Sequence, residues 1–274
     1  MSKNIIMVPL DELHPPEIHP FQVRHDEEME RLARSIKENG VIEPGLVRSR
    51  AEGGYELISG NRRKMACYLA GLPTMPVIIR ELDDYTATIM MVDSNLEQRE
   101  QILLSEKAAA YKVKMDALNH KGIKDEKQSV EILMEQTGES RSQIFRLLRL
   151  TELIIELSDK LDAKELAFNP AVALSHLSIQ EQKAVASAMD NFGVKPSVSQ
   201  ADKLKKLKQS GELTTDVINE ILSVDKGSTK ENKAITQYRK FFPDDFTAEQ
   251  INAVITKLLQ EWRSKKDFGL EESA

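Results

Sequence analysis

The sequence predicts a mixed α+β domain at the N-terminus, followed by an all-α region with a helix-turn-helix and a helical C-terminal part. Short apolar or alternating runs bounded by glycine and proline, the pattern typical of strands, fall within the first 82 residues. From residue 84 onward the apolar residues recur at helical spacing. We therefore expect three domains, over residues 1–100, 101–190 and 191–274.

The composition limits the possible functions of the chain. Its 274 residues carry a net charge of −6, so a nucleic-acid partner would have to meet a local basic patch. An aromatic content of 5% argues against an all-β sandwich and against stacking platforms for single strands. No run resembles a signal peptide or a membrane span, so we expect a cytoplasmic protein without membrane contact.

Strands and helices are expected to alternate in the N-terminal domain. The patterns predict strands over residues 5–10, 45–48, 55–58 and 75–82, and helices over residues 26–39, 61–70 and 84–95. Three prolines impose an extended path before the first helix, and His14, His19 and His25 in that path lack the spacing of metal ligands. Val77, Ile78 and Ile79 are expected to be a buried run in the last strand.

The turn at residues 59–64, Ser-Gly-Asn-Arg-Arg-Lys, joins a predicted strand to a predicted helix. Free backbone N–H groups at a helix start attract anions, whereas the helix dipole disfavours cations there. A phosphate bound by the arginines would reverse that disadvantage, because guanidinium bonds phosphate oxygens bidentately. A solvated basic helix end fits the spacing equally well. The following helix is expected to carry Met65, Ala66, Leu69 and Ala70 on one face, and the lone Cys67 is expected to be a buried thiol.

Two further segments have chemical interest. Asp93, Ser94 and Asn95 offer carboxylate, hydroxyl and amide oxygens suited to Mg²⁺, although they also fit an ordinary helix C-terminus. Residues 128–136 and 141–150 read as two short helices about the turn Thr137-Gly138-Glu139-Ser140, in which Ser140 caps a second helix that has three arginines and no acid. This is the layout of a helix-turn-helix that enters a major groove, and the alternative is an ordinary helical hairpin.

The remaining chain is expected to be helical. A stripe over residues 105–120, containing Ala108, Tyr111, Met115 and Leu118, predicts one helix, and Pro170 is expected to begin another. Residues 193–199 read as a linker before one or two helices over residues 200–224. The last predicted helix, residues 247–265, has a wide apolar stripe that suits either a homodimer surface or burial in its own small domain.

Four segments stand in a fixed order: residues 19–24 with 32–44, residues 60–63 with 70–72, residues 94–100, and the helix-turn-helix. In this order they resemble the ParB/Spo0J partition protein family over about residues 5–190. The resemblance implies a ParB/sulfiredoxin-like N-terminal fold and a homodimer that recognises a palindromic, centromere-like double-stranded DNA site. It also implies binding of CTP and Mg²⁺, closure into a sliding clamp, slow CTP hydrolysis, association with the nucleoid or a plasmid, and a ParA-type ATPase as partner.

The resemblance also assigns residues. The nucleotide would be held by Gln22, Arg24, Gly60, Asn61, Arg62, Arg63 and Asn95. Asn95 would help to hold Mg²⁺. DNA would be contacted by Ser140, Arg141, Ser142, Gln143 and Arg146.

The chain departs from the family pattern near the metal. Asn61 and Ser94 stand where members usually have Glu, and Glu43 stands where many have Gln. Loss of a carboxylate should weaken Mg²⁺ binding unless Asp93 or Glu97 substitutes. The sequence therefore supports CTP binding more strongly than CTP hydrolysis. Two alternatives remain: a sequence-specific regulator of a mobile element without nucleotide switching, and an enzyme similar to sulfiredoxin or nucleotide-using serine kinases. The helix-turn-helix and the position of Cys67 argue against the enzyme.

Overall fold

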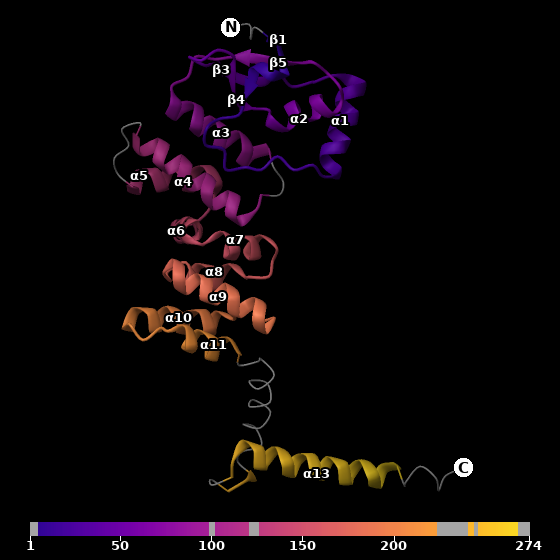
Figure 1. Ribbon diagram of the computed structural model, residues 1–274, viewed down its shortest axis with the longest axis vertical. Coiled ribbons are helices and arrows are strands. Elements are labelled where there is room, and N and C mark those ends of the chain that lie inside the picture. Colours follow the sequence, from indigo (N-terminus) through magenta and orange to yellow (C-terminus); the bar gives the residue numbers. More distant parts are fainter. Residues whose placement is uncertain (1–4, 99–101, 121–125, 224–240, 244–245, 268–274) are drawn as a thin grey trace, which may run out of the picture.

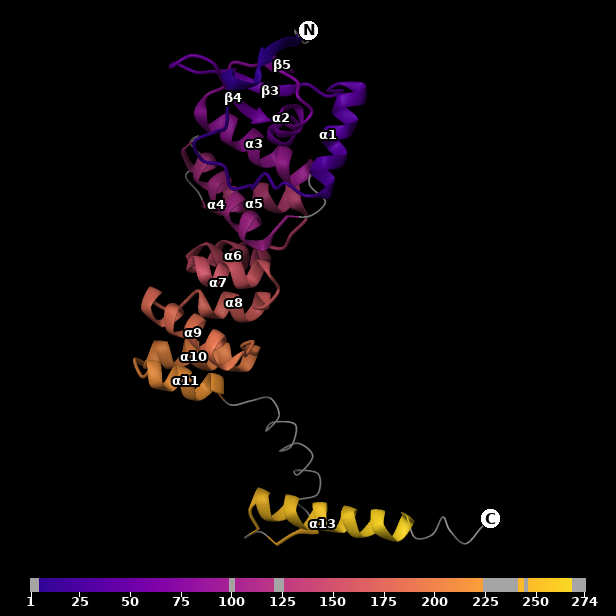
Figure 2. The ribbon, with the colours of Figure 1, turned by 45° about the vertical axis from the view of Figure 1, so that its right-hand side comes forward.

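The computed structural model describes residues 5–98, 102–120, 126–223, 241–243 and 246–267, in an α+β N-terminal part followed by layers of helices (Figures 1 and 2). The N-terminal part contains a five-stranded sheet in the order β1-β5-β3-β4-β2. Its strands are β1 Ile5–Pro9, β2 Leu13–His14, β3 Gly45–Ser49, β4 Tyr55–Ser59 and β5 Thr74–Ile79. β1 pairs antiparallel with β5 and β3 pairs antiparallel with β4, while β3–β5 and β2–β4 are parallel.

Helices cover both faces of this sheet. Adjacent residues of a strand point to opposite faces, and on β4 Leu57 and Ile58 belong to different apolar clusters. Leu57 packs in the cluster that contains α1, Glu27–Asn39, and α2, Asn61–Leu69. Ile58 packs in the cluster that contains α3, Asp84–Gln98. α1 and α2 therefore pack on one face of the sheet, and α3 packs on the other.

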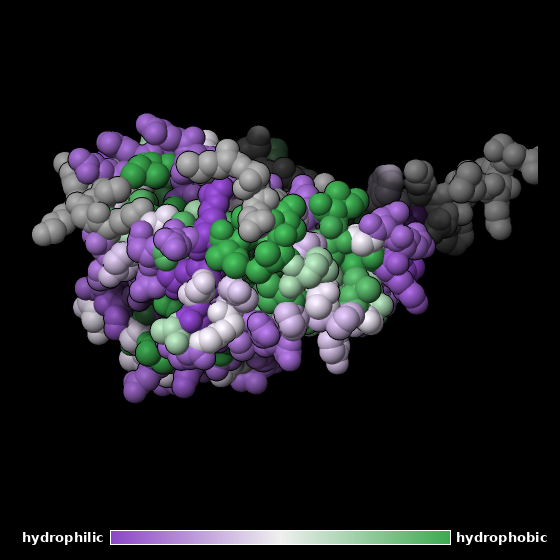
Figure 3. Space-filling model, turned by 90° about the horizontal axis from the view of Figure 1, so that it is seen from above, coloured by the Kyte–Doolittle hydropathy of each residue, from purple (hydrophilic) through white to green (hydrophobic). Residues whose placement is uncertain are grey.

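Cys67 is buried, as expected, and Ala66 is buried beside it. The face expected to be apolar is covered only in part, because Met65 and Leu69 are 39% and 40% exposed. The buried run expected in β5 is wrong, because the burial alternates, so that Val77 is buried and Ile79 is exposed. The end of the molecule that carries β1 shows a patch of apolar side chains amid polar ones (Figure 3). Exposed Ile5, Met7 and Ile79 belong to strands β1 and β5 of this domain.

The second part is helical throughout its described residues. Its elements are α4 Leu104–His120, α5 Glu126–Thr137, α6 Arg141–Arg149, α7 Ile155–Asp162, α8 Phe168–Leu174, α9 Ile179–Phe192, α10 Val198–Ser210 and α11 Thr215–Ser223. Ser140 caps α6 by accepting from the Gln143 backbone N–H, and Ser178 and Ser197 form capping boxes that begin α9 and α10. The expected stripe of α4 is buried.

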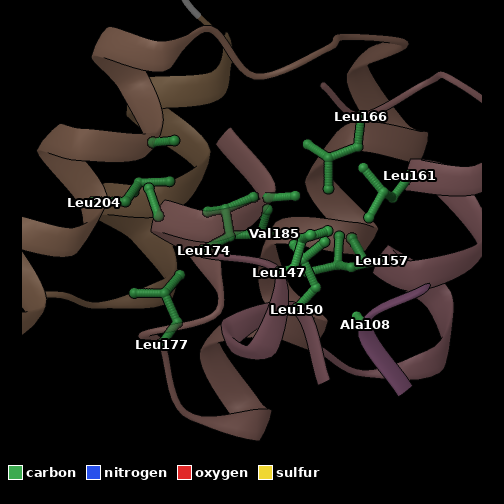
Figure 4. Packing of buried hydrophobic residues seen from close by; sticks show 14 of the residues in the cluster. Ala108, Leu147, Leu150, Leu157, Leu161, Leu166, Leu174, Leu177, Val185 and Leu204 are labelled. Carbon is green, nitrogen blue, oxygen red and sulfur yellow. The ribbon is translucent and has the colours of Figure 1, made fainter. Parts of the chain in front are cut away.

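One apolar cluster runs from Ala108 to Leu222 (Figure 4). It takes in α10 and α11, so the domain boundary expected at residue 190 does not coincide with a break in packing. Pro170 does not begin α8 but is its third residue. Proline is tolerated there because N–H groups of the first turn have no intrahelical acceptor.

A final helix, α13 Ala248–Asp267, carries the wide stripe expected from the sequence. Ile251 is buried, whereas Leu258, Leu259 and Trp262 are about 60% exposed. Within the described part of the chain, no helix has the length and apolar character needed to cross a membrane. Arg99 and Glu100 of the third family-like segment lie outside the described residues.

Candidate nucleotide pocket and helix-turn-helix

A cavity of about 490 Å³ lies at the N-terminal end of α2. The β4–α2 turn forms its floor, and α1 forms a wall with Glu28, Arg31, Leu32 and Ser35. Five of the seven predicted nucleotide residues line it, namely Gly60, Asn61, Arg62, Arg63 and, from α3, Asn95. Segments that are distant in the sequence thus meet at one pocket.

Gly60 allows a tight turn between β4 and α2. Its φ of +117° lies in the region that favours glycine, and a Cβ there would stand 3.3 Å from the Cα of Gly45. α2 begins at the next residue, with the Lys64 N–H donating to the Gly60 carbonyl at 2.8 Å. The preceding N–H groups have no intrahelical acceptor, which makes this end of the pocket favourable for an anion.

Arg62 and Arg63 occupy different environments. The Arg63 Nη1 donates to the backbone carbonyls of Glu43 at 2.7 Å and Pro44 at 2.9 Å. Burial lowers the pKa of this guanidinium. Arg62 is more exposed and forms an ion pair of 3.1 Å with Glu28 of α1. Arg63 therefore connects the turn to the loop before β3, whereas Arg62 connects it to α1.

Two more polar contacts connect this turn to the proline-rich segment. The Asn61 Nδ2 lies 3.2 Å from the His19 Nε2, and the Lys64 Nζ donates to the Leu13 carbonyl at 2.5 Å. Burial lowers the pKa of Lys64. Lys64 therefore faces β2 instead of the pocket.

Gln22 and Arg24 do not line the pocket. The Gln22 backbone N–H donates to the Oε1 of Glu106 at 3.0 Å, and Glu106 is a buried residue of α4. Arg24 is exposed on the way to α1. Gln22 and Arg24 are therefore the two predicted nucleotide residues that are not among those lining this pocket.

The three oxygen-bearing residues at the end of α3 point to different partners. The Asn95 Nδ2 donates to the Met91 carbonyl at 2.8 Å, a bond that does not use its Oδ1, and Asn95 lines the pocket. Ser94 donates to the same carbonyl, and Asp93 forms an ion pair with the buried Lys114 of α4. Asp93 is thus already engaged, and Asn95 alone of the three lines the pocket. No group of three or more His, Cys, Asp or Glu positioned for a metal occurs among the described residues.

The predicted DNA residues gather at the start of α6. Ser140, Arg141 and Ser142 are exposed, and Gln143 is half-buried. Arg146 lies further along the helix, hydrogen-bonded to Asn169 and with its Cζ 4.8 Å from the ring centroid of Phe168, both in α8. α5 and α6 meet through Gly138, whose φ is +70°.

Sequence reasoning missed the pocket wall supplied by α1. Residues 32–44 belong to the first family-like segment, but no residue of this helix was among the predicted nucleotide residues. Glu28, Arg31 and Ser35 lie about one helical turn apart on one face. The spacing i, i+3, i+7 of polar residues was the available signal. The buried charges Glu106 and Lys114 were also missed, because both lie within an otherwise apolar helix pattern.

Residues 1–96 match the ParB N-terminal domain family. Over 263 residues the chain is 29% identical to the chromosome-partitioning protein Spo0J of Thermus thermophilus, covering 93% of this chain and 90% of that one. A probable chromosome-partitioning protein ParB of Vibrio cholerae is 34% identical over 61% of this chain and 55% of its own length. The chain spans about half the length of this and several other curated relatives.

Two crystal structures of the C-terminally truncated chromosome-partitioning protein ParB from Caulobacter crescentus are also similar. One is complexed to the centromeric parS site, with 28% identity, coverage of 73% of this chain and 98% of that one, and a TM-score of 0.45. The other is complexed with CTP-gamma-S, with 30% identity, coverage of 68% and 99%, and a TM-score of 0.33.

Proposed function

Since this chain belongs to the ParB/Spo0J family, we propose that it is a DNA-binding partition protein that recognises a palindromic centromere-like site and binds CTP with Mg²⁺. Nucleotide binding would switch it into a clamp on DNA during plasmid or chromosome segregation. The observation that carries this proposal is the pocket at the start of α2, where Gly60, Arg62, Arg63 and Asn95 come together.

The pocket has the chemistry of a polyphosphate site. Arg31, Arg62 and Arg63 all line it, and α2 directs its first N–H groups toward it. Its volume of about 490 Å³ is in the range typical of small-molecule sites. CTP is the nucleotide to test first, because the Caulobacter relative at 30% sequence identity was crystallised with CTP-gamma-S.

Asn95 fits a Mg²⁺ ion bound to the same phosphates, because the Oδ1 of its amide is an oxygen ligand of the kind Mg²⁺ accepts. The ion would supply charge neutralisation between phosphate oxygens. The Asp93 carboxylate is paired with Lys114, and the side chain of Asn61 is an amide. Few carboxylates are therefore available to assist hydrolysis. We expect nucleotide binding and switching with slow hydrolysis at most.

The pair α5–α6 supports binding to a major groove. The exposed start of α6 offers Ser140, Arg141 and Ser142, and Gln143 follows one position later. Arg146 is oriented against Phe168 and Asn169, so it would reach a phosphate or a base from a fixed position. A palindromic site requires two copies of the chain, and the exposed stripe of α13 is the surface that suits a homodimer. A ParA-type ATPase is the further partner that membership of the family suggests.

The nucleotide proposal is tested by titrating the full chain with CTP, ATP, GTP and UTP in the presence of Mg²⁺, with and without its DNA. CTP should bind preferentially, and Arg62→Ala should abolish binding while the circular dichroism spectrum stays unchanged. Arg34→Ala, an exposed arginine of α1 that does not line the pocket, is the matched control. Absence of affinity for every nucleotide would leave the alternative, a DNA-binding regulator without nucleotide switching.

The DNA proposal is tested by selecting bound genomic fragments and measuring affinity for the enriched palindrome. Arg146→Ala and Arg141→Ala should each weaken binding about tenfold, and the slope of affinity against salt should become shallower if a phosphate contact is lost. Lys183→Ala, in α9, is the control for removal of a positive charge. Unchanged affinity in both arginine variants would remove α6 from the interface.

A further inference from the structure

The pocket wall supplied by α1 carries charges of both signs. Glu28, Arg31, Leu32 and Ser35 line the pocket, at spacings that place them on one face of the helix. Another face of the same helix buries Met29, Ala33 and Ile36 against the sheet. Because this apolar face anchors α1, the polar wall is held beside the arginine turn.

Glu28 forms an ion pair with the guanidinium of Arg62, a group that a bound phosphate would need. Its Oε2 lies 3.1 Å from the Nη2 of Arg62, which is the more exposed arginine of the turn. A carboxylate and a phosphate compete for the same donors on guanidinium. The Glu28 carboxylate would also repel a polyphosphate in the pocket, because both are anions only a few ångströms apart.

Arg31 stands one turn further along α1. Among the residues that the structure describes, it has no ion pair and no side-chain hydrogen bond, yet it lines the pocket together with Arg62 and Arg63. A phosphate that binds the turn therefore has a second, unoccupied guanidinium beside it.

We propose that Glu28 and Arg31 form a charge gate on the pocket, an inference that rests on the nucleotide-binding function proposed above. In the empty pocket Glu28 holds Arg62. A bound polyphosphate takes Arg62 from Glu28 and gains Arg31 from the α1 wall. α1 and α2 are then held together by the ligand instead of by the Glu28–Arg62 pair, so Glu28 opposes binding and Arg31 favours it.

The two residues should have effects of opposite sign on CTP affinity, measured calorimetrically with Mg²⁺ on the full chain. An exposed ion pair contributes about 0.2–1 kcal/mol, so removing the competitor in Glu28→Gln should tighten CTP binding about two- to fivefold. Arg31→Ala should weaken it about tenfold, as expected for loss of a charged hydrogen bond. Both changes should shrink at high salt, because the pocket is open to solvent.

The controls lie on the same helix. Glu30→Gln removes a charge from the same first turn as Glu28→Gln. Arg34→Ala removes an arginine side chain, as Arg31→Ala does. Neither Glu30 nor Arg34 lines the pocket. Loss of an acid from a helix N-terminus slightly destabilises the helix, so tighter binding by Glu28→Gln cannot come from weakened structure. Both controls should bind CTP as the unmodified chain does.

The outcomes separate the gate from the proposed function. If CTP binds and Glu28→Gln fails to tighten it, or Arg31→Ala fails to weaken it, the gate is overturned and the function stands. If CTP does not bind, inorganic tripolyphosphate is the probe, and opposite shifts in the two variants would support the gate without CTP. Binding of neither anion overturns both.

Discussion

Arg62, Arg63 and Lys64 are neighbours in the sequence, but each side chain meets a different part of the fold. Arg63 bonds the carbonyls before β3, Lys64 bonds a carbonyl of β2, and Arg62 pairs with Glu28. Each cation at the start of α2 thus has a protein partner, so its presence there does not by itself require a bound anion. The stronger reason to expect a ligand is the cavity itself, where Arg62 can exchange its partner.

Gly60→Ala should destabilise the fold and abolish nucleotide binding. A non-glycine residue at φ +117° costs about 1–3 kcal/mol, and the added Cβ would stand 3.3 Å from the Cα of Gly45. Gly53→Ala is the control, because Gly53 has a φ of +92° with open space around it. Urea unfolding should show the larger loss for Gly60→Ala, and equal losses would mean that the close approach to Gly45 is unimportant.

Tyr111 should make stability fall at alkaline pH. Burial raises the pKa of its phenol to about 12, above its ordinary value near 10 in an unfolded chain. The folded state therefore keeps a proton that the unfolded state loses, so this contribution is complete below pH 10 and disappears as pH rises toward 12. The loss should reach about 3 kcal/mol, measured by urea unfolding at stepped pH. Tyr111→Phe should show a smaller decrease across the same interval.

At the scale of elements, α4 connects the N-terminal part to the helical part. Glu106, near its start, accepts from the Gln22 backbone, and Lys114, two turns later, contacts Asp93 of α3 and Gln136 of α5. Both charged side chains are buried. The end of α3 that carries Asn95 is thus connected through Asp93 to α4, the helix that packs against α5 and α6.

Asp93→Ala should destabilise the chain more than Lys114→Met. Removing Asp93 leaves a buried ammonium without its counter-ion, at a cost of about 3 kcal/mol. Removing Lys114 leaves Asp93, which is 29% exposed and can be hydrated, so the loss should be about 1 kcal/mol. Thermal unfolding of both variants measures which one loses more stability. A greater loss for Lys114→Met would show that the packing of the Lys114 side chain matters more than its charge.

At the scale of the whole molecule, two polar sites lie on an acidic chain. Because the net charge is −6, the proposed attraction to phosphate has to come from local groups, and the first turns of α2 and α6 contain basic residues and no acid. α13 adds an apolar surface, because Leu258, Leu259 and Trp262 are exposed along it. Such a stripe suits association with a second copy of the chain.

Replacing Leu258 and Leu259 together by Glu should convert a dimer into a monomer. The two side chains are 58% and 59% exposed, so the change adds charge to the proposed interface without disturbing a buried core. Sedimentation equilibrium at micromolar concentration measures the state. Thr256→Glu, which is exposed and polar on the same helix, is the control. If the unmodified chain is a monomer, α13 is not a homodimer surface.

Local patterns identified most elements and the polar turn. The Ser140 cap, the Gly138 turn and the strand–Gly60–helix sequence all depend on contacts within a few residues, so they could be read from the chain. The buried face of α2 could not, because Met65 and Ala66 are both apolar and only their neighbours decide which is covered. The same holds for β5, where one face is more open than the other.

The order of the elements, the turn at Gly60 and the basic start of α6 can be read from the amino-acid sequence, because they follow from backbone preference and residue spacing. Which of the motif residues meet depends on the packing of the folded chain. This packing brings Arg62 and Asn95 to one pocket with Glu28 and Arg31, places Gln22 against Glu106, and engages Asp93 with Lys114. These contacts join residues that lie far apart in the chain, and their formation depends on how α1, α3 and α4 pack around the sheet.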